Sequence, residues 1–299
     1  MKNFKAYLYL TLAMTIVGSS LVVGKIVTST FPVFLASCLS LFVASVIFIP
    51  LLWQSEGKFP KLKKKDLLII SLQALIGTFL YRIFLLYGLR YINAAESGII
   101  TSTTSAAIAV FSYLLLREQL KSNKILGVIF SVMGVLVINI GFNQNTVGQN
   151  PTLVLGVLLI FASVIAEALF SVLAKFVSND VKPTTMAAFI TIFSFFMFLP
   201  FAIYEGTTFD LTSLRFTDWL PIFYYGAFVT VISFSLWFKG LAKVEASTAG
   251  IFLGIVPVSS VVLSYIILRE SFSWSHIAGA LFVIIGILLI SKEPKYAKK

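Results

Sequence analysis

Charge is the scarcest property of this sequence. Only 12% of its 299 residues are charged, while 59% belong to the hydrophobic set. Soluble domains carry about 25% charged residues, so this chain has too few to cover a 33.0 kDa globule in water. The scarcity excludes a soluble enzyme and a free nucleic-acid-binding module, and the hydrophobicity excludes disorder. A polytopic membrane protein remains.

Cysteine and histidine are almost missing as well. Cys38 and His276 are the single residues of their types, which leaves no pair for an intrachain disulfide and no H-E-x-x-H zinc motif. A phosphate-binding loop fails between Gly18 and Lys25, because five residues instead of four separate its glycines and Ile26 replaces the required Ser or Thr. We therefore expect no metal, no cofactor and no ATP site.

What the chain does have is long apolar runs. A membrane-spanning helix needs about 20 mostly apolar residues, and these runs are too long and too continuously apolar for barrel strands. The fold class is therefore predicted to be all-α, with ten transmembrane helices. The ten stretches are 5–28, 31–53, 67–89, 97–116, 123–141, 152–177, 184–204, 217–240, 246–268 and 274–291.

Lysine and arginine fall mostly on one side of these predicted spans. With the N-terminus inside, the cytoplasmic segments hold 18 of them, the opposite segments hold four, and Arg82 lies within a span. Because cytoplasmic loops are enriched in Lys and Arg, this asymmetry predicts a multi-pass protein of the plasma membrane with both termini in the cytoplasm. It also accounts for the net charge of +11 without a nucleic-acid partner.

The sequence repeats itself at an offset of 152 residues. Residues 113–118 resemble residues 265–270, and an ungapped comparison of 88–138 with the stretch 152 residues later gives 17 identities in 51 positions. The chain therefore divides into two five-helix halves, 1–141 and 152–291, with a linker at 142–151 and a basic tail at 292–299. Because five is odd, the second half enters the membrane from the opposite face, and the halves are predicted to be inverted repeats.

Inverted repeats are typical of secondary transporters that rock about a site near the membrane midplane. A duplication retained only for stability is the alternative. The repeated pattern is a small-residue helix, a Leu-Arg-Glu turn and a helix with glycines seven residues apart. It resembles the EamA-type branch of the drug/metabolite transporter superfamily over essentially the whole chain. The residues that carry the resemblance are Leu116, Arg117, Glu118, Gly127 and Gly134, and Leu268, Arg269, Glu270, Gly279 and Gly286.

The resemblance implies a ten-helix secondary transporter, generally an exporter of amino acids or related metabolites. Its glycines are assigned to helix packing. The halves differ at one position, where Pro257 in the second half matches Ser105 in the first. A proline bends a helix more sharply than a hydroxyl residue does, so both positions are candidates for gating.

Two ionisable residues lie inside predicted spans, where such groups are costly and mark function by default. Arg82 and Glu167 have uncharged counterparts in the other half, Phe234 and Val17. One interpretation is a structural ion pair. The other places both on the substrate path, where Arg82 would hold a carboxylate and Glu167 an amine or a transported proton.

Five further polar or aromatic residues could add hydrogen bonds or an aromatic wall to a cavity, or could simply join helices. They are Thr15, Ser19, Gln73, Tyr81 and Trp237. The favoured function is export of small organic metabolites by alternating access, with protons as a candidate coupling ion. The alternatives are an enzyme or flippase acting on lipid-linked substrates, or a channel. Monomer and homodimer both stay open.

Overall fold

The computed structural model describes most of the chain. The described residues are 4–57, 60, 62–101, 103–117, 122, 123, 125–127, 129, 130, 133, 151–246, 249, 252–269 and 274–291. Every regular element within these ranges is a helix, which confirms the all-α prediction for this part of the protein. Residues 142–150 of the linker, most of the predicted fifth span, Gly134, and the Glu118 and Glu270 of the repeated turn lie outside the described residues.

Seven described helical segments are long and apolar enough to cross a membrane. Two shorter apolar segments, Phe252–Leu268 and Ile277–Gly286, lie where the ninth and tenth spans are predicted. The seven long segments are Phe4–Thr30, Val33–Glu56, Lys64–Tyr91, Glu96–Leu116, Thr152–Phe176, Pro183–Thr208 and Phe216–Leu241. Each overlaps one of the predicted apolar runs.

The third span of each half changes its helical winding midway. In the first half α3 (Lys64–Ala74) passes through a π-helical turn at Leu75–Leu80 into α4 (Tyr81–Tyr91). In the second half α11 (Trp219–Tyr224) and α12 (Ser233–Leu241) flank a π-helical turn at Tyr225–Ile232. Such turns occur often at functional sites, because the extra residue redirects side chains.

The fourth span of the first half is broken at its cluster of hydroxyl residues. There α5 (Ala94–Thr101) ends and α6 (Thr104–Leu116) begins, with Ser105 as the second residue of α6. In the second half a 3-10 turn at Phe252–Gly254 precedes α14 (Ile255–Leu263). Pro257 lies in the first turn of α14, where a missing N–H leaves no helical hydrogen bond unmade.

The repeated Leu-Arg-Glu turn has a conformational basis. Arg117 and Arg269 are the non-glycine residues with positive φ in the described chain, at 55° and 52°. Each ends its helix in the left-handed region, and its N–H bonds back to the carbonyl of Ser112 or Ser264. This is a common way to end a helix. The motif therefore sets matched helix ends in the two halves.

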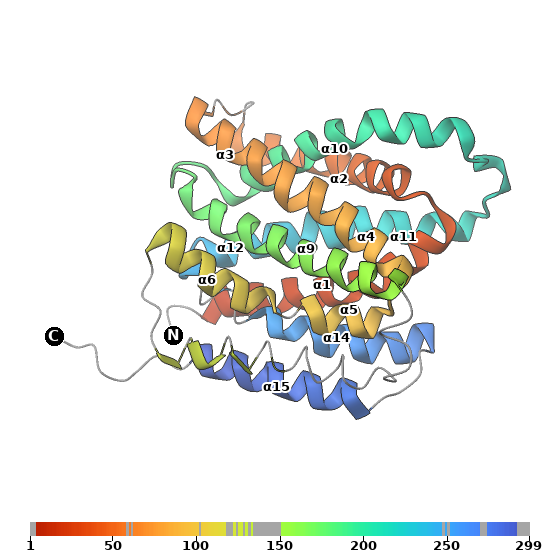
Figure 1. The fold of residues 1–299 in the computed structure, drawn as a ribbon. Helices are drawn as coiled ribbons and strands as arrows, with labels where there is room; N and C mark the ends of the chain where they lie inside the picture. Colours follow the sequence, from red (N-terminus) through yellow and green to blue (C-terminus); the bar gives the residue numbers. More distant parts are fainter. Residues whose placement is uncertain are drawn as a thin grey trace.

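Each half packs its first helix against the other half. Helix α1 (Phe4–Thr30) contacts α12 and α14, while α9 (Pro151–Leu173) contacts α4, α5 and α6. Helices α2 (Val33–Glu56) and α10 (Pro183–Thr208) pack against each other. Figure 1 shows α9 between the α5–α6 layer and α12, and α1 beside α14, with α15 (Trp274–Ser291) outermost. The two halves therefore share one core.

Glycines at matched positions allow the first helix of each half to pack closely against the other half. A Cβ added to Gly88 would lie 2.6 Å from Ile160 of α9, and one added to Gly240 would lie 2.6 Å from Leu10 of α1. Gly88 and Gly240 are 152 residues apart, and Leu10 and Ile160 are 150 apart. The same contact is thus made twice. Gly127, Gly279 and Gly286, predicted to pack helices, are buried.

Matched lysines tie helix ends together. Lys25 donates from Nζ to the carbonyls of Leu89 and, at 2.8 Å, Ile92, while Lys175 donates to Val244 and, at 2.7 Å, Leu241. The lysines are 150 residues apart, and their acceptors are 152 apart. Carbonyls at a helix C-terminus have no partner within the helix, so each lysine satisfies two of them.

Candidate functional site

A cavity of about 60 Å³ lies where the two halves meet. Its walls come from α1, from α9, and from the two third spans near their π-helical turns. The volume has room for only a few water molecules. The lining residues are Val17, Ser20, Gly77, Thr78, Tyr81, Arg82, Glu167, Phe170, Tyr225, Val229 and Phe234.

Most of this lining consists of matched positions. Four pairs of residues at matched positions in the two halves lie in the wall. The members of two pairs are 150 residues apart in the sequence, and those of the other two pairs are 152 apart. The four pairs are Val17 with Glu167, Ser20 with Phe170, Gly77 with Val229, and Arg82 with Phe234. The cavity therefore lies at the junction of the two halves. Arg82 and Glu167 are the lining residues whose matched positions in the other half, Phe234 and Val17, carry no charge.

Arg82 is buried, with 4% of its surface exposed. Its two terminal nitrogens donate to Ser40 Oγ at 2.8 Å and Thr230 Oγ1 at 2.7 Å, and its guanidinium carbon lies 5.1 Å from the ring centre of Tyr225. A guanidinium has five N–H donors, so three remain beyond these two bonds. Within the described part of the chain, no carboxylate forms an ion pair with Arg82.

Glu167 makes its side-chain contact at the break between α5 and α6. Its Oε2 lies 3.1 Å from Thr104 Oγ1, which in turn donates to the carbonyl of Thr101 at 2.6 Å. A hydroxyl carries one proton and a carbonyl can only accept. The single proton of the Thr104 hydroxyl is therefore shared between the carbonyl of Thr101 and the carboxyl of Glu167.

The structure brings Arg82 and Glu167 to one cavity without joining them in an ion pair. Tyr81, also singled out from sequence, lies on the same wall. Gln73 is fully buried nearby, where its Nε2 donates 2.9 Å to the carbonyl of the lining residue Phe170. Its Oε1 has no hydrogen-bond partner among the described residues. Two of the five predicted polar or aromatic residues, Tyr81 and Gln73, thus lie at or next to the cavity.

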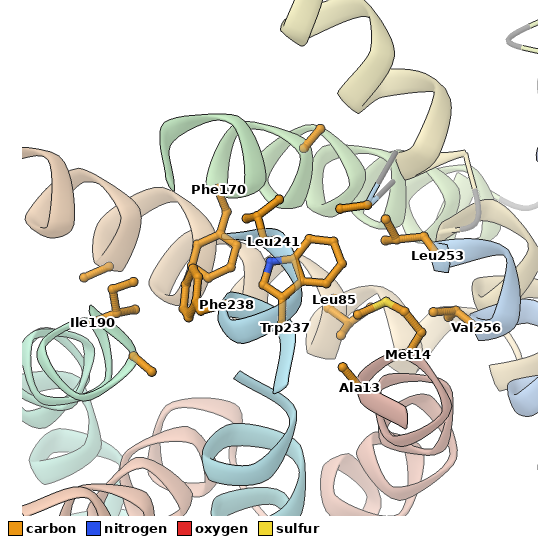
Figure 2. Close-up of a cluster of buried hydrophobic side chains, with 14 of the residues drawn as sticks. Ala13, Met14, Leu85, Phe170, Ile190, Trp237, Phe238, Leu241, Leu253 and Val256 are labelled. Atoms are coloured by element: carbon orange, nitrogen blue, oxygen red, sulfur yellow. The ribbon is translucent and has the colours of Figure 1, made fainter. Parts of the chain in front are cut away.

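The other three lie elsewhere. Figure 2 shows Trp237 among apolar side chains, close to Met14, Leu85 and Leu241. Ser19 contacts the Tyr224 hydroxyl at 2.6 Å, and Thr15 is exposed and donates to the carbonyl of Thr11. None of Trp237, Ser19 and Thr15 lines the central cavity.

Several cavity residues escaped the sequence reasoning. Ser40, Thr230 and Tyr225 surround the guanidinium of Arg82, and Thr78 is a buried lining residue whose hydroxyl has no described partner. One signal could have revealed two of them. Thr78 and Thr230 are identical residues at the offset of 152, inside otherwise apolar runs.

Several known proteins are similar to this chain over most of its length. The model of the EamA-like transporter family matches the chain twice, at residues 4–140 and 154–292. YetK, an uncharacterized transporter of Bacillus subtilis, is 43% identical over 294 residues, covering 98% of this chain and 89% of its own. An uncharacterized transporter of Archaeoglobus fulgidus is 26% identical, covering 78% of this chain and 80% of its own.

A solved crystal structure has the same fold. It superposes with a TM-score of 0.70 at 20% sequence identity, and the match covers 95% of each chain. This likeness supports the arrangement of the helices.

Proposed function

The chain belongs to the EamA-like transporter family, and from this premise we propose that it exports small organic metabolites as a secondary transporter. A member of this family is a transporter and not an enzyme. The observation that carries the proposal is the cavity, which is walled by matched residues of both halves and holds Arg82 and Glu167. Transporters built from repeats commonly bind cargo at the repeat interface.

We propose ten transmembrane helices in two inverted repeats, 1–141 and 152–291, with both termini in the cytoplasm of a plasma-membrane protein. Three matched features support two equivalent halves: the π-helical turns, the left-handed arginines and the lysine-capped helix ends. Alternating access would follow if each half rocks against the other around the fixed cavity. Widening of the cavity would admit cargo larger than a few waters.

The cavity chemistry fits a cargo that carries a carboxylate and an amine. The spare N–H donors of Arg82 would bind the carboxylate, because a guanidinium matches its two oxygens. Glu167, on the other half, would bind the amine. Amino acids and related compounds have both groups, which is why we infer them as the cargo class.

Proton coupling follows from the proposed roles of Glu167. An ionised carboxyl inside a membrane span is costly, so Glu167 would carry a proton in the empty cavity, whereas an ammonium group is bound best by a carboxylate. Proton and amine would therefore exclude each other at one site. Cargo moves outward with Glu167 ionised, and the empty carrier returns inward with a proton. This cycle exchanges one external proton for one zwitterion.

The test is counterflow in proteoliposomes containing the purified protein, with a panel of radiolabelled amino acids and metabolites. Acceleration by unlabelled cargo on the opposite side is expected of a carrier and is not expected of a simple pore. Arg82→Ala should abolish counterflow, and Thr15→Val, which removes an exposed hydroxyl outside the cavity, should leave it unchanged. Wild-type counterflow without trans acceleration, or an unaltered Arg82→Ala variant, would overturn the proposal.

A further inference from the structure

Arg82 borders two cavities. Besides the central cavity, it lines a smaller space of about 10 Å³ together with Tyr225. The other walls of this outer cavity come from the end of α1, the beginning of α2, and α4 and α11. They are Val27, Ala36, Ser37, Ser40, Leu86 and Ile222.

The outer cavity lies toward the face formed by the turn between α1 and α2. Val27, Ala36 and Ile222 pack in one apolar cluster with Phe31, the residue at that turn. The guanidinium of Arg82 and the ring of Tyr225 stand between this cavity and the central one. A group that leaves the central cavity toward the α1–α2 turn must therefore pass Arg82.

Ser37 supplies a hydroxyl without a described partner on this wall. It is 1% exposed, and none of the described residues accepts from or donates to its Oγ. Buried helical serines usually donate to a carbonyl three or four residues earlier, as Ser40 does to the carbonyl of Ser37. Ser37 makes no such bond. Its hydroxyl is therefore available to a group inside the cavity.

The charge of the wall fits an anion. Arg82 is the cationic residue among the described residues of the lining, and its partners on this side are the neutral Ser40 hydroxyl and the Tyr225 ring. Three guanidinium donors stay unused by those hydroxyls, and the Ser37 hydroxyl can donate as well. No carboxylate lines this space.

We propose that the outer cavity is a second binding site (the station) for an anionic group. Arg82 receives this group from the central cavity and holds it together with Ser37. The present volume is that of one water molecule, so the station is closed here and opens as the helices separate. The cargo carboxylate would turn about Arg82 from one cavity to the other without leaving the guanidinium. The station rests on the proposed function and specifies where the cargo carboxylate binds during transport.

The experiment measures charge selectivity at Ser37. A Ser37→Cys variant in a Cys38→Ala background, purified in detergent, is treated with methanethiosulfonates that carry either a sulfonate or a trimethylammonium group. Rates are normalised to those of a small free thiol. The sulfonate should react about fivefold faster or more, the effect of one charge about 4 Å away even in water. Replacing Arg82 by Gln should remove the preference.

Ser45→Cys is the matched control, because Ser45 lies on the same helix, is buried, has an unpartnered hydroxyl and lines neither cavity. Three results would overturn the station. They are no reaction at Ser37→Cys, the same normalised ratio of sulfonate to trimethylammonium rates as at Ser45→Cys, and a preference for the sulfonate that survives Arg82→Gln. If the cysteine variant does not fold, Ser37→Ala should raise the half-saturating cargo concentration in counterflow about tenfold, and Ser45→Ala should not. Failure of wild-type counterflow overturns the transport proposal alone, since labelling requires no transport.

Discussion

Gly77 offers a sharp test of how closely the two halves meet at the central cavity. A Cβ added there would lie 2.1 Å from Cδ2 and 2.3 Å from Cβ of Phe170, where ordinary contact begins at 3.4 Å. The Phe170 ring could rotate, but its Cβ is fixed to the backbone of α9. The π-helical turn and α9 would therefore have to separate by about 1 Å to accept a methyl group.

This perturbation has a definite size. Overpacking of a close-packed interior costs about 1–3 kcal/mol, which corresponds to a roughly 5- to 150-fold change in a conformational equilibrium. Gly77→Ala should therefore depopulate the conformation described above relative to more open ones. We expect a slower initial rate of counterflow in proteoliposomes and a lower melting temperature in detergent.

Gly206→Ala provides the control, because a Cβ at Gly206 of α10 meets nothing within 4 Å. It makes the same chemical change in a helix and should leave both readouts unchanged. The cost of Gly77→Ala should also shrink in a Phe170→Gly background, which removes the Phe170 Cβ as well as the ring, since residues in contact couple energetically. If Gly77→Ala behaves like Gly206→Ala, or costs as much without the Phe170 side chain as with it, the inferred contact is wrong.

Three further changes address the guanidinium, the proton and the helix ends. Thr230→Val removes one acceptor from Arg82 and should raise the half-saturating cargo concentration about tenfold, since hydrogen bonds to charged groups contribute about 1.5–3 kcal/mol; an unchanged value would contradict this positioning role. Glu167→Gln cannot release a proton, so its counterflow should lose the acceleration by an inward proton gradient that the wild type shows; retained acceleration would remove Glu167 from coupling. Lys175→Met leaves the carbonyls of Leu241 and Val244 without that donor and should lower the stability in detergent by about 1–3 kcal/mol. Thermal unfolding would reveal this loss against Lys239→Met, which changes an exposed lysine of α12.

The sequence was most informative where a residue contrasts with its surroundings. Arg82 and Glu167 are ionisable groups in apolar runs, and such groups are costly enough in a membrane to mark a site by themselves. The apolar runs themselves have the length of a membrane span, so the described spanning helices could be predicted. The repeated Leu-Arg-Glu turn likewise predicted matched features, which the left-handed arginines display.

The partners of those charges could not be predicted in the same way. Ser40 and Thr230 are ordinary hydroxyls in apolar helices, where bonding to the residue's own helix is the usual outcome. Their contact with Arg82 depends on how α2 and the second π-helical turn pack around α4. The π-helical turns change which side chains face the cavity, and hydrophobic periodicity does not reveal them. Of the two roles open to Trp237, a cavity wall or helix packing, its place in the shared core fits helix packing (Figure 2).

The exchange of first helices also has a consequence for biosynthesis. Leu10 packs against Gly240, a residue that leaves the ribosome long after it. At about 5–20 residues per second, α1 waits roughly 10–50 s in the bilayer before its partner helix exists. Throughout that interval its small-residue face is open to lipid or to other nascent helices. A chain truncated before α12 should therefore be recognised as unfinished by the cell's membrane quality control, however well its remaining helices insert.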